Sequence, residues 1–222
     1  MWNNKEYYNY IFDLYGTLVE IHTNEEKPSL WAYMSKYLAK NFGVEKSPEE
    51  LQTDYKEYCK KEVDRLILEN HVRDPEIKIE NVWQRIIKRR CSDDEMFELC
   101  YSFREQSRDR FGRYKGVAEA LAKLKKEGKR VFLLSNAQRV YAIKELEVAG
   151  LIQYFDDIFI SSDFGIKKPE KKFLEMLMEK HGMSKTKTVM IGNEIRTDGA
   201  IAKKVGIDAI IEEHGDFLKI LP

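Results

Sequence analysis

From Gly116 onward the sequence alternates between segments with the pattern of a helix and segments with the pattern of a short buried strand. The expected helices span 116–127, 139–149, 170–182 and 197–205, and the expected strands span 130–134, 157–161, 187–191 and 208–211. Such alternation is typical of βαβ units, in which parallel strands form one sheet and helices cover both of its faces. We therefore predict an α/β fold with a Rossmann-like parallel sheet.

One more strand precedes these units near the start of the chain. The run Tyr10-Ile11-Phe12 is short and apolar, it ends at Asp13, and Gly16 lets the backbone turn tightly just beyond it. A carboxylate at the carboxyl end of a buried strand stands where open α/β sheets place their chemistry. Asp13 is therefore a candidate nucleophile or metal ligand, and the plain alternative is a residue that only caps the turn.

Polar residues also follow two of the later strands, and a lysine stands in the loop before the helix at 170–182. These residues are Ser135, Asn136, Asn193 and Asp198 from the strand ends, and Lys168 from the loop. Because the carboxyl ends of parallel strands meet at one edge of a sheet, we expect these groups to converge on Asp13 in one small site.

The strand patterns stop between the first strand and about residue 112. Helical spacing follows Ser29, a capped helix start lies at Ser47-Pro48-Glu49-Glu50, and further helices are expected over 77–90 and 93–111. Helices without a strand between them do not belong in the sheet. We predict an inserted α-helical cap domain over residues 19–112, entirely helical, with hinges at 19–24 and 111–116. Residues 1–18 and 113–222 would then form the α/β core.

Composition narrows the class of protein. The 222 residues suffice for one α/β core with a smaller insert, and 38 basic residues balance 38 acidic ones, which gives no support for binding nucleic acid. No apolar run is long enough to span a bilayer, and the first residues lack the apolar stretch of a signal peptide. The three cysteines have no metal-binding spacing and are expected to be buried free thiols in helices. We expect a cytoplasmic protein without a nucleic-acid or membrane partner.

Taken in order, these motifs resemble those of the haloacid-dehalogenase-like (HAD) hydrolase superfamily, over residues 8 to about 211. The four segments are Asp13-Leu14-Tyr15-Gly16-Thr17, Ser135-Asn136, Lys168-Pro169, and Gly192-Asn193 with Asp198. Each segment alone is a weak signal, but the ordered set is specific for the superfamily. The helical insert is similar to the C1-type cap of that superfamily, which closes over the active site.

The resemblance implies a role for each group that handles the substrate. Asp13 would be the nucleophile that attacks the substrate, and water would then release the product from the acyl intermediate. Lys168, with its neighbour Lys167 as the alternative, would supply a positive charge, and Ser135 would donate a hydrogen bond. Asn136 and Tyr15 would contact the substrate.

The resemblance also implies a metal ion. Mg²⁺ prefers oxygen ligands and usually keeps several waters. Asp13, the backbone carbonyl of Tyr15, Asn193 and Asp198 would provide such ligands at this edge of the sheet.

Two departures from the superfamily pattern divide the functional interpretation. HAD phosphatases usually carry a second aspartate two positions after the nucleophile, whereas this chain has Tyr15, as the 2-haloacid dehalogenases do. The fourth motif favours a phosphatase instead, because dehalogenases resemble Ser-x-Asn-x-x-Asp there, and this chain has Asn193 with Asp198 five positions on. The stretch 29–43 also lacks the arginine that dehalogenases present from their first cap helix.

We therefore predict a Mg²⁺-dependent phosphohydrolase that acts on a small phosphorylated metabolite, as a monomer or homodimer. Two alternatives remain at this stage. One is a 2-haloacid dehalogenase-type hydrolase that needs no metal, and the other is a binder of a phosphorylated metabolite without turnover. The binder would not need the nucleophile Asp13, which the chain retains.

Overall fold

The computed structural model describes residues 6–212, so the ends of the predicted core domain, residues 1–5 and 213–222, lie outside the described residues. The chain divides into two compact units. One unit consists of the chain up to Ile21 and from Phe111 onward, and the other consists of His22–Arg110.

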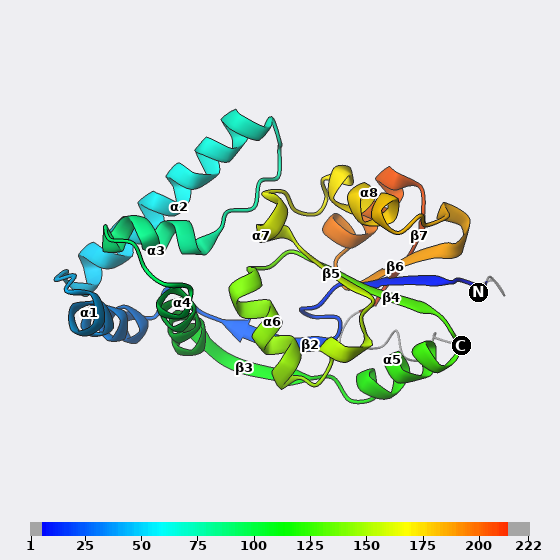
Figure 1. Ribbon diagram of the computed structural model, residues 1–222, viewed down its shortest axis with the longest axis horizontal. Helices are drawn as coiled ribbons and strands as arrows, with labels where there is room; N and C mark the ends of the chain where they lie inside the picture. The colour runs from blue at the N-terminus through cyan, green and yellow to red at the C-terminus, as the bar shows by residue number, and fades with distance from the viewer. Residues whose placement is uncertain (1–5, 213–222) are drawn as a thin grey trace. The chain divides into compact units, whose positions relative to one another are not determined.

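The first unit contains a five-stranded sheet in the order β5-β4-β1-β6-β7, in which every pair of neighbouring strands is parallel (Figure 1). The strands are β1 (Asn9–Phe12), β4 (Arg130–Ser135), β5 (Asp157–Ile160), β6 (Thr188–Gly192) and β7 (Asp208–Ile211). This sheet confirms the predicted α/β fold. It places the end of β1 between the ends of β4 and β6, at the centre of the sheet.

Helices follow the strands as the alternating pattern predicts. They are α5 (Val117–Lys126), α6 (Arg139–Val148), α7 (Ser161–Phe164), α8 (Lys171–Lys180) and α9 (Ala200–Val205), with short helical turns at Ile152–Tyr154, Lys185–Lys187 and Ile195–Gly199. The last of these turns is a π-helical turn, so the helix expected from residue 197 begins only at Ala200.

Both faces of the sheet are buried, because successive side chains of a strand point to opposite faces. Tyr10 and Phe12 of β1 pack in one core cluster with the apolar side chains of α5 and α6. Ile11, between them in the strand, is also fully buried, but it lies outside that cluster. Burial on both faces explains why the strands read as continuous apolar runs.

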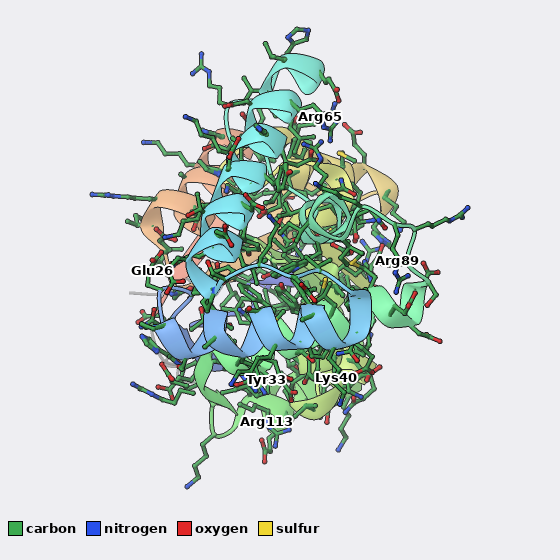
Figure 2. The ribbon with its side chains drawn as sticks, turned by 90° about the vertical axis from the view of Figure 1, so that its left-hand side faces the viewer. Glu26, Tyr33, Lys40, Arg65, Arg89 and Arg113 are labelled. Atoms are coloured by element: carbon green, nitrogen blue, oxygen red, sulfur yellow. The ribbon has the colours of Figure 1, made fainter. Side chains whose placement is uncertain are left out.

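The second unit is built around four helices, seen from the side in Figure 2. They are α1 (Pro28–Phe42), α2 (Pro48–Asn70), α3 (Ile79–Ile87) and α4 (Asp93–Ser107). Ser47 and Ser92 cap α2 and α4 in capping boxes, and the sequence analysis predicted the helix start at Ser47. The interior holds an aromatic cluster, Trp31, Tyr55, Trp83 and Phe103, with ring centroids 5.1–5.6 Å apart.

The prediction that residues 19–112 are entirely helical is wrong at both ends of that segment. β2 (Val19–Thr23) and β3 (Arg108–Arg113) form a two-stranded sheet there. The signal in the sequence was the β-branched alternation of Val19, Ile21 and Thr23, which favours a strand. The helix expected over 93–111 ends at Ser107, because the following residues pair in β3.

The three cysteines are free thiols. Only Cys100 is buried; Cys59 and Cys91 are half-buried, and Cys91 lies in the loop before α4 and not in a helix. The prediction of buried thiols in helices is thus right for Cys100 alone. Within residues 6–212, no helix has the length and apolar character needed to cross a bilayer. The cytoplasmic location and the oligomeric state stay predictions.

Candidate active site

Lys168 joins two of the predicted acidic residues at the carboxyl edge of the sheet. Its Nζ donates to Asp13 Oδ1 over 2.6 Å, to Asp198 Oδ1 over 2.7 Å and to the carbonyl of Leu134 over 2.8 Å. An ammonium group has three donors, so these bonds use all of them. Lys168 is 3% exposed and Asp198 is fully buried, so the charges are held in a fixed arrangement with little water around them.

The main chain fixes the position of Asp13. Its N–H donates to the carbonyl of Ile191 in β6 over 2.9 Å, which extends the strand pairing by one residue beyond β1. The chain then turns at Gly16, whose φ of 80° is in the left-handed region. A Cβ at Gly16 would lie 2.4 Å from the amide nitrogen of Asn193, so the turn and the fourth motif approach each other closely only because Gly16 lacks a side chain.

A second close approach places Asp198. A Cβ at Gly192 would lie 2.2 Å from the Asp198 carboxyl group, so glycine at the end of β6 leaves the space that this carboxylate fills. The Glu194 N–H donates to Asp198 Oδ2 over 3.1 Å. Asn193 lies beside this segment, and its Oδ1 accepts a hydrogen bond from the Thr17 hydroxyl over 3.2 Å.

Asn136 holds the backbone of Lys168. Its Oδ1 accepts from the Lys168 N–H over 2.8 Å, and its Nδ2 donates to the Lys168 carbonyl over 3.0 Å. The side-chain amide is therefore engaged with the protein itself. The contact between Asn136 and the substrate stays a prediction. Because both hydrogen bonds use the side-chain amide, the main chain of Asn136 is the part that would make this contact.

Ser135 ends β4 with its hydroxyl group buried. Among the residues that the structure describes, its Oγ has no hydrogen-bond partner. A buried hydroxyl without a partner costs free energy, so such a group in a folded protein calls for an explanation. A ligand oxygen next to Ser135 would supply the missing hydrogen bond.

The phenol of Tyr15 has a partner that the sequence analysis missed. Its hydroxyl donates to Oε2 of Glu145 over 2.5 Å, and Glu145 is 1% exposed on α6. The signal for Glu145 was present in the sequence, because it stands within the apolar stripe formed by Ala142, Leu146 and Ala149. A glutamate in that stripe is buried when the helix packs on the sheet.

Burial and mutual charge shift the pKa values in this group. Burial raises the pKa of Asp13 to about 6 from 3.8; the nearby Asp198 adds to this, while Lys168 opposes it. Burial alone would lower the pKa of Lys168, but the carboxylates of Asp13 and Asp198 outweigh it and leave that pKa raised. Lys168 is therefore a fixed positive charge at neutral pH.

The raised pKa of Asp13 predicts that the difference in stability between wild type and Asp13→Asn depends on pH. The folded state favours protonated Asp13, so this contribution to stability is complete below pH 3.8 and is lost as the pH rises through about 6. Asp13→Asn removes the ionisation. In EDTA at pH 8, we expect the variant to have a free energy of unfolding about 1–3 kcal/mol higher than wild type.

Urea unfolding of both proteins between pH 4 and pH 8 measures this difference. The advantage of Asp13→Asn should shrink below about pH 6 and disappear near pH 4. If the stability advantage of Asp13→Asn over wild type grows as the pH falls, folding favours the carboxylate form of Asp13, contrary to the burial argument.

The donor set at this edge fits a hard cation. Asp13 and Asp198 contribute two carboxylates against the single charge of Lys168, so the group has a net negative charge before any cation binds. Asn193 and the backbone carbonyl of Tyr15 are the predicted neutral oxygens of this set, and their role as ligands stays a prediction. Within residues 6–212, no cluster of three or more His, Cys, Asp or Glu side chains is placed to hold a metal. Two carboxylates with neutral oxygens suit Mg²⁺ and not zinc.

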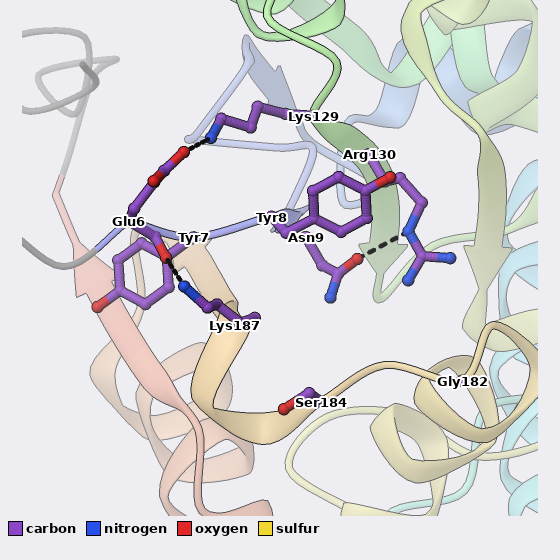
Figure 3. A pocket seen from close by; sticks show the side chains of 9 residues that line it. All are labelled: Glu6, Tyr7, Tyr8, Asn9, Lys129, Arg130, Gly182, Ser184 and Lys187. Atoms are coloured by element: carbon purple, nitrogen blue, oxygen red, sulfur yellow. Dashed lines mark hydrogen bonds and ion pairs between the residues drawn. The ribbon is translucent and has the colours of Figure 1, made fainter.

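A separate cavity of about 440 Å³ lies at the opposite edge of the sheet, near the starts of β1, β4 and β6 (Figure 3). Its cationic side chains are engaged within the protein. Lys129 pairs with Glu6 over 2.6 Å, and Arg130 donates to Asn9 Oδ1 over 2.8 Å. Because these groups already have partners, we do not assign this cavity to the site formed around Asp13.

Comparisons with known proteins bear on the family and the fold of the chain. The family model for haloacid dehalogenase-like hydrolases matches residues 10–211. Glyceraldehyde 3-phosphate phosphatase from Methanothermobacter thermautotrophicus is 26% identical over 98 residues, which is 44% of this chain and 43% of that protein. The chain spans less than half the length of the first curated relatives that it matches.

Two solved structures share the fold. The HAD phosphatase from Thermococcus onnurineus has a TM-score of 0.58 at 20% identity, covering 91% of this chain and 85% of that one. The L-2-haloacid dehalogenase from Xanthobacter autotrophicus has a TM-score of 0.52 at 16% identity, covering 91% and 76%. At these identities, the likeness concerns the fold and does not separate phosphatase from dehalogenase.

A model match over most of the sequence, together with the parallel sheet and the ordered motifs, defines the class. The chain belongs to the haloacid dehalogenase-like hydrolase family, which confirms the resemblance of the ordered motifs to this superfamily, and the C1 type of the cap stays a prediction.

Proposed function

We propose that this chain is a Mg²⁺-dependent phosphohydrolase that uses Asp13 as its nucleophile and acts on a small phosphorylated metabolite. The observation that carries the proposal is the arrangement of Lys168 between Asp13 and Asp198, next to the buried Ser135 hydroxyl, which has no partner within residues 6–212. A phosphoryl group brings an oxygen that would accept from Ser135, and the positive charge of Lys168 would offset part of its negative charge. Relatives named as phosphatases support the same chemistry.

The protein's own groups account for the steps of such a reaction. A carboxylate oxygen of Asp13 attacks phosphorus as the bond to the leaving oxygen breaks, which gives an aspartyl phosphate and a leaving-group anion that takes its proton from water. Water then cleaves the aspartyl phosphate and restores the carboxylate. Lys168 and Ser135 neutralise and orient the charged oxygens throughout.

The oxygens of Asp13, Tyr15, Asn193 and Asp198 would hold the cation. When bound, Mg²⁺ supplies positive charge that offsets the charge of the phosphoryl group. The Glu194 N–H and Lys168 donate to the Asp198 carboxylate and hold it in place, which supports the proposed role. The helical unit, residues 22–110, would act as the cap of the active site.

The presence of Tyr15 two positions after Asp13 favours the dehalogenase alternative. A carbon–halogen bond breaks without protonation of the leaving group, so a dehalogenase does not need an acid at that position. Hydrolysis of a panel of phosphomonoesters and 2-haloacids, with and without Mg²⁺, separates the functions. We expect phosphomonoester hydrolysis that requires Mg²⁺. Halide release without metal would establish the dehalogenase, and binding without turnover would establish the binder.

Magnesium should also stabilise the folded protein. At concentrations well above its dissociation constant, a ligand of the native state raises stability by about 2–3 kcal/mol, which raises Tm by several degrees. We expect Asp198→Asn to abolish this rise in a thermal melt. Glu194→Gln is the matched control, since Glu194 is an exposed carboxylate in the same segment, and it should keep the rise. Equal rises in wild type and Asp198→Asn would remove Asp198 from the metal site.

A further inference from the structure

Glu145 is a buried carboxylate that the proposed mechanism does not use. It lies on α6, 1% exposed, among the apolar residues that pack this helix in the core. A carboxylate in such a place is costly unless donors surround it. An apolar side chain would pack there at a lower free-energy cost, so the Glu145 carboxylate is expected to have a role of its own.

The Tyr15 hydroxyl is a donor to that carboxylate. It reaches Glu145 Oε2 from the turn that carries Asp13, across 130 residues of sequence. A phenol has a single hydrogen to donate, and ionised carboxylates are strong acceptors. The bond therefore commits the phenol hydrogen to Glu145.

Hydrogen bonds also hold the main chain around Tyr15. The Gly16 N–H donates to the Val19 carbonyl over 2.8 Å, and the Val19 N–H donates to the Leu14 carbonyl over 3.1 Å. These bonds form a small bridge between Tyr15 and Val19. Side chain and backbone together leave Tyr15 little freedom to turn its hydroxyl toward a reacting group.

We propose that Glu145 is a positioning residue that keeps the Tyr15 hydroxyl on α6, so that Tyr15 does not protonate the leaving group. The substrates are then phosphoryl groups on leaving groups that depart without a proton, such as acyl and aryl phosphates. This inference rests on the proposed phosphohydrolase function. General acid catalysis is typically worth roughly 10²–10⁴-fold in rate, and alkyl phosphates should be slower by a factor of this order.

The first test compares p-nitrophenyl phosphate with an alkyl phosphate in Mg²⁺. We expect Tyr15→Phe to change the ratio of the two kcat/KM values by less than about threefold, because the phenol hydrogen held by Glu145 is not donated to the leaving group. Glu145→Leu releases that hydrogen and should raise the alkyl-to-aryl ratio; an unchanged ratio in this variant would overturn the positioning role. Glu145→Gln keeps an acceptor and should stay nearer to wild type. Glu147→Leu and Glu147→Gln are matched controls, because Glu147 is exposed on the same helix.

The second test measures the pairing without using activity. Tyr15→Phe leaves Glu145 without this donor, and we expect Tm to fall by about 3–8 °C. Replacing both partners removes the buried charge too, so Tyr15→Phe/Glu145→Leu should melt no lower than Tyr15→Phe. Additive losses in the double variant would show that the two side chains do not act as a pair and would overturn the positioning role.

A third variant supplies a general acid next to the nucleophile. Tyr15→Asp/Glu145→Leu places a carboxyl group two residues after the nucleophile and removes the buried carboxylate that would repel it. Compared with Tyr15→Phe/Glu145→Leu, it should raise the alkyl-to-aryl ratio by about tenfold or more. An unchanged ratio would mean that another group, such as Glu194, already protonates the leaving group.

The outcomes distinguish the two proposals. If Tyr15→Phe slows alkyl phosphates by about 10²-fold more than aryl phosphates, Tyr15 is the acid, and the inference is overturned while the phosphohydrolase stands. If the wild-type chain hydrolyses no phosphomonoester, the proposed function fails and the substrate class fails with it.

Discussion

Asp13→Asn should abolish phosphomonoester hydrolysis, with a loss of roughly 10⁴-fold or more in kcat. Asparagine has the size of aspartate and can still accept a hydrogen bond from Lys168, but its amide is no nucleophile in this reaction. The loss should be as large for p-nitrophenyl phosphate as for alkyl phosphates, because the nucleophile is needed whatever the leaving group. Steady-state kinetics in Mg²⁺ measures the effect.

Asp163→Asn is the matched control for this substitution. Asp163 is an exposed aspartate that pairs with Arg139 over 2.6 Å, and we expect its variant to keep wild-type kinetics. Rapid acid quenching should trap a phosphorylated enzyme in the control and none in Asp13→Asn. If Asp13→Asn still forms a phosphoenzyme, the nucleophile is another residue.

Lys168→Met should cause the largest loss of stability of any substitution considered. The change leaves Asp13 and Asp198 buried close together without the cation that both contact. Removing one partner of a buried ion pair typically costs about 3–5 kcal/mol, and we expect a loss of this size in urea unfolding at pH 7. Activity should fall by about 10²–10³-fold or more, since the charge that orients the phosphoryl group is gone.

Lys167→Met is the matched control, because Lys167 is the preceding lysine and the alternative candidate for the same role. It is half-buried, and we expect its substitution to change the free energy of unfolding by about 0.5 kcal/mol or less. Lys168→Met/Asp198→Asn should regain part of the stability, because one of the two unpaired carboxylates is removed, without regaining activity. If Lys167→Met is the more damaging change, the assignment of Lys168 is wrong.

Some features of the site were predictable because they depend on short stretches of sequence. An apolar run followed by Asp13 and Gly16 indicates a buried strand with a carboxylate and a tight turn at its end, whatever the rest of the chain does. The helix–strand alternation predicted the parallel sheet, since βαβ units have one favoured arrangement. The polar residues at other strand ends then had to lie at the same edge.

Other features depended on contacts between distant segments. β2 and β3 are short, and each is stabilised by pairing with the other, so the local alternation in residues 19–23 was too short to predict a strand without its partner. The three bonds of Lys168 required the loop before α8 to meet the ends of β1 and β4 and the π-helical turn Ile195–Gly199. No spacing in the sequence specifies such distances.

By itself, the sequence determined the fold class, the identity of the residues at the strand ends and their common edge, because hydrophobic periodicity and turn residues act locally. Only the tertiary structure decided which partner each side chain takes. It paired Asn136 with the Lys168 backbone, left the Ser135 hydroxyl without a partner in the described residues, and joined Tyr15 to Glu145. The physical reason is that burial makes every polar group find a specific partner, and that partner is chosen by packing across the sheet.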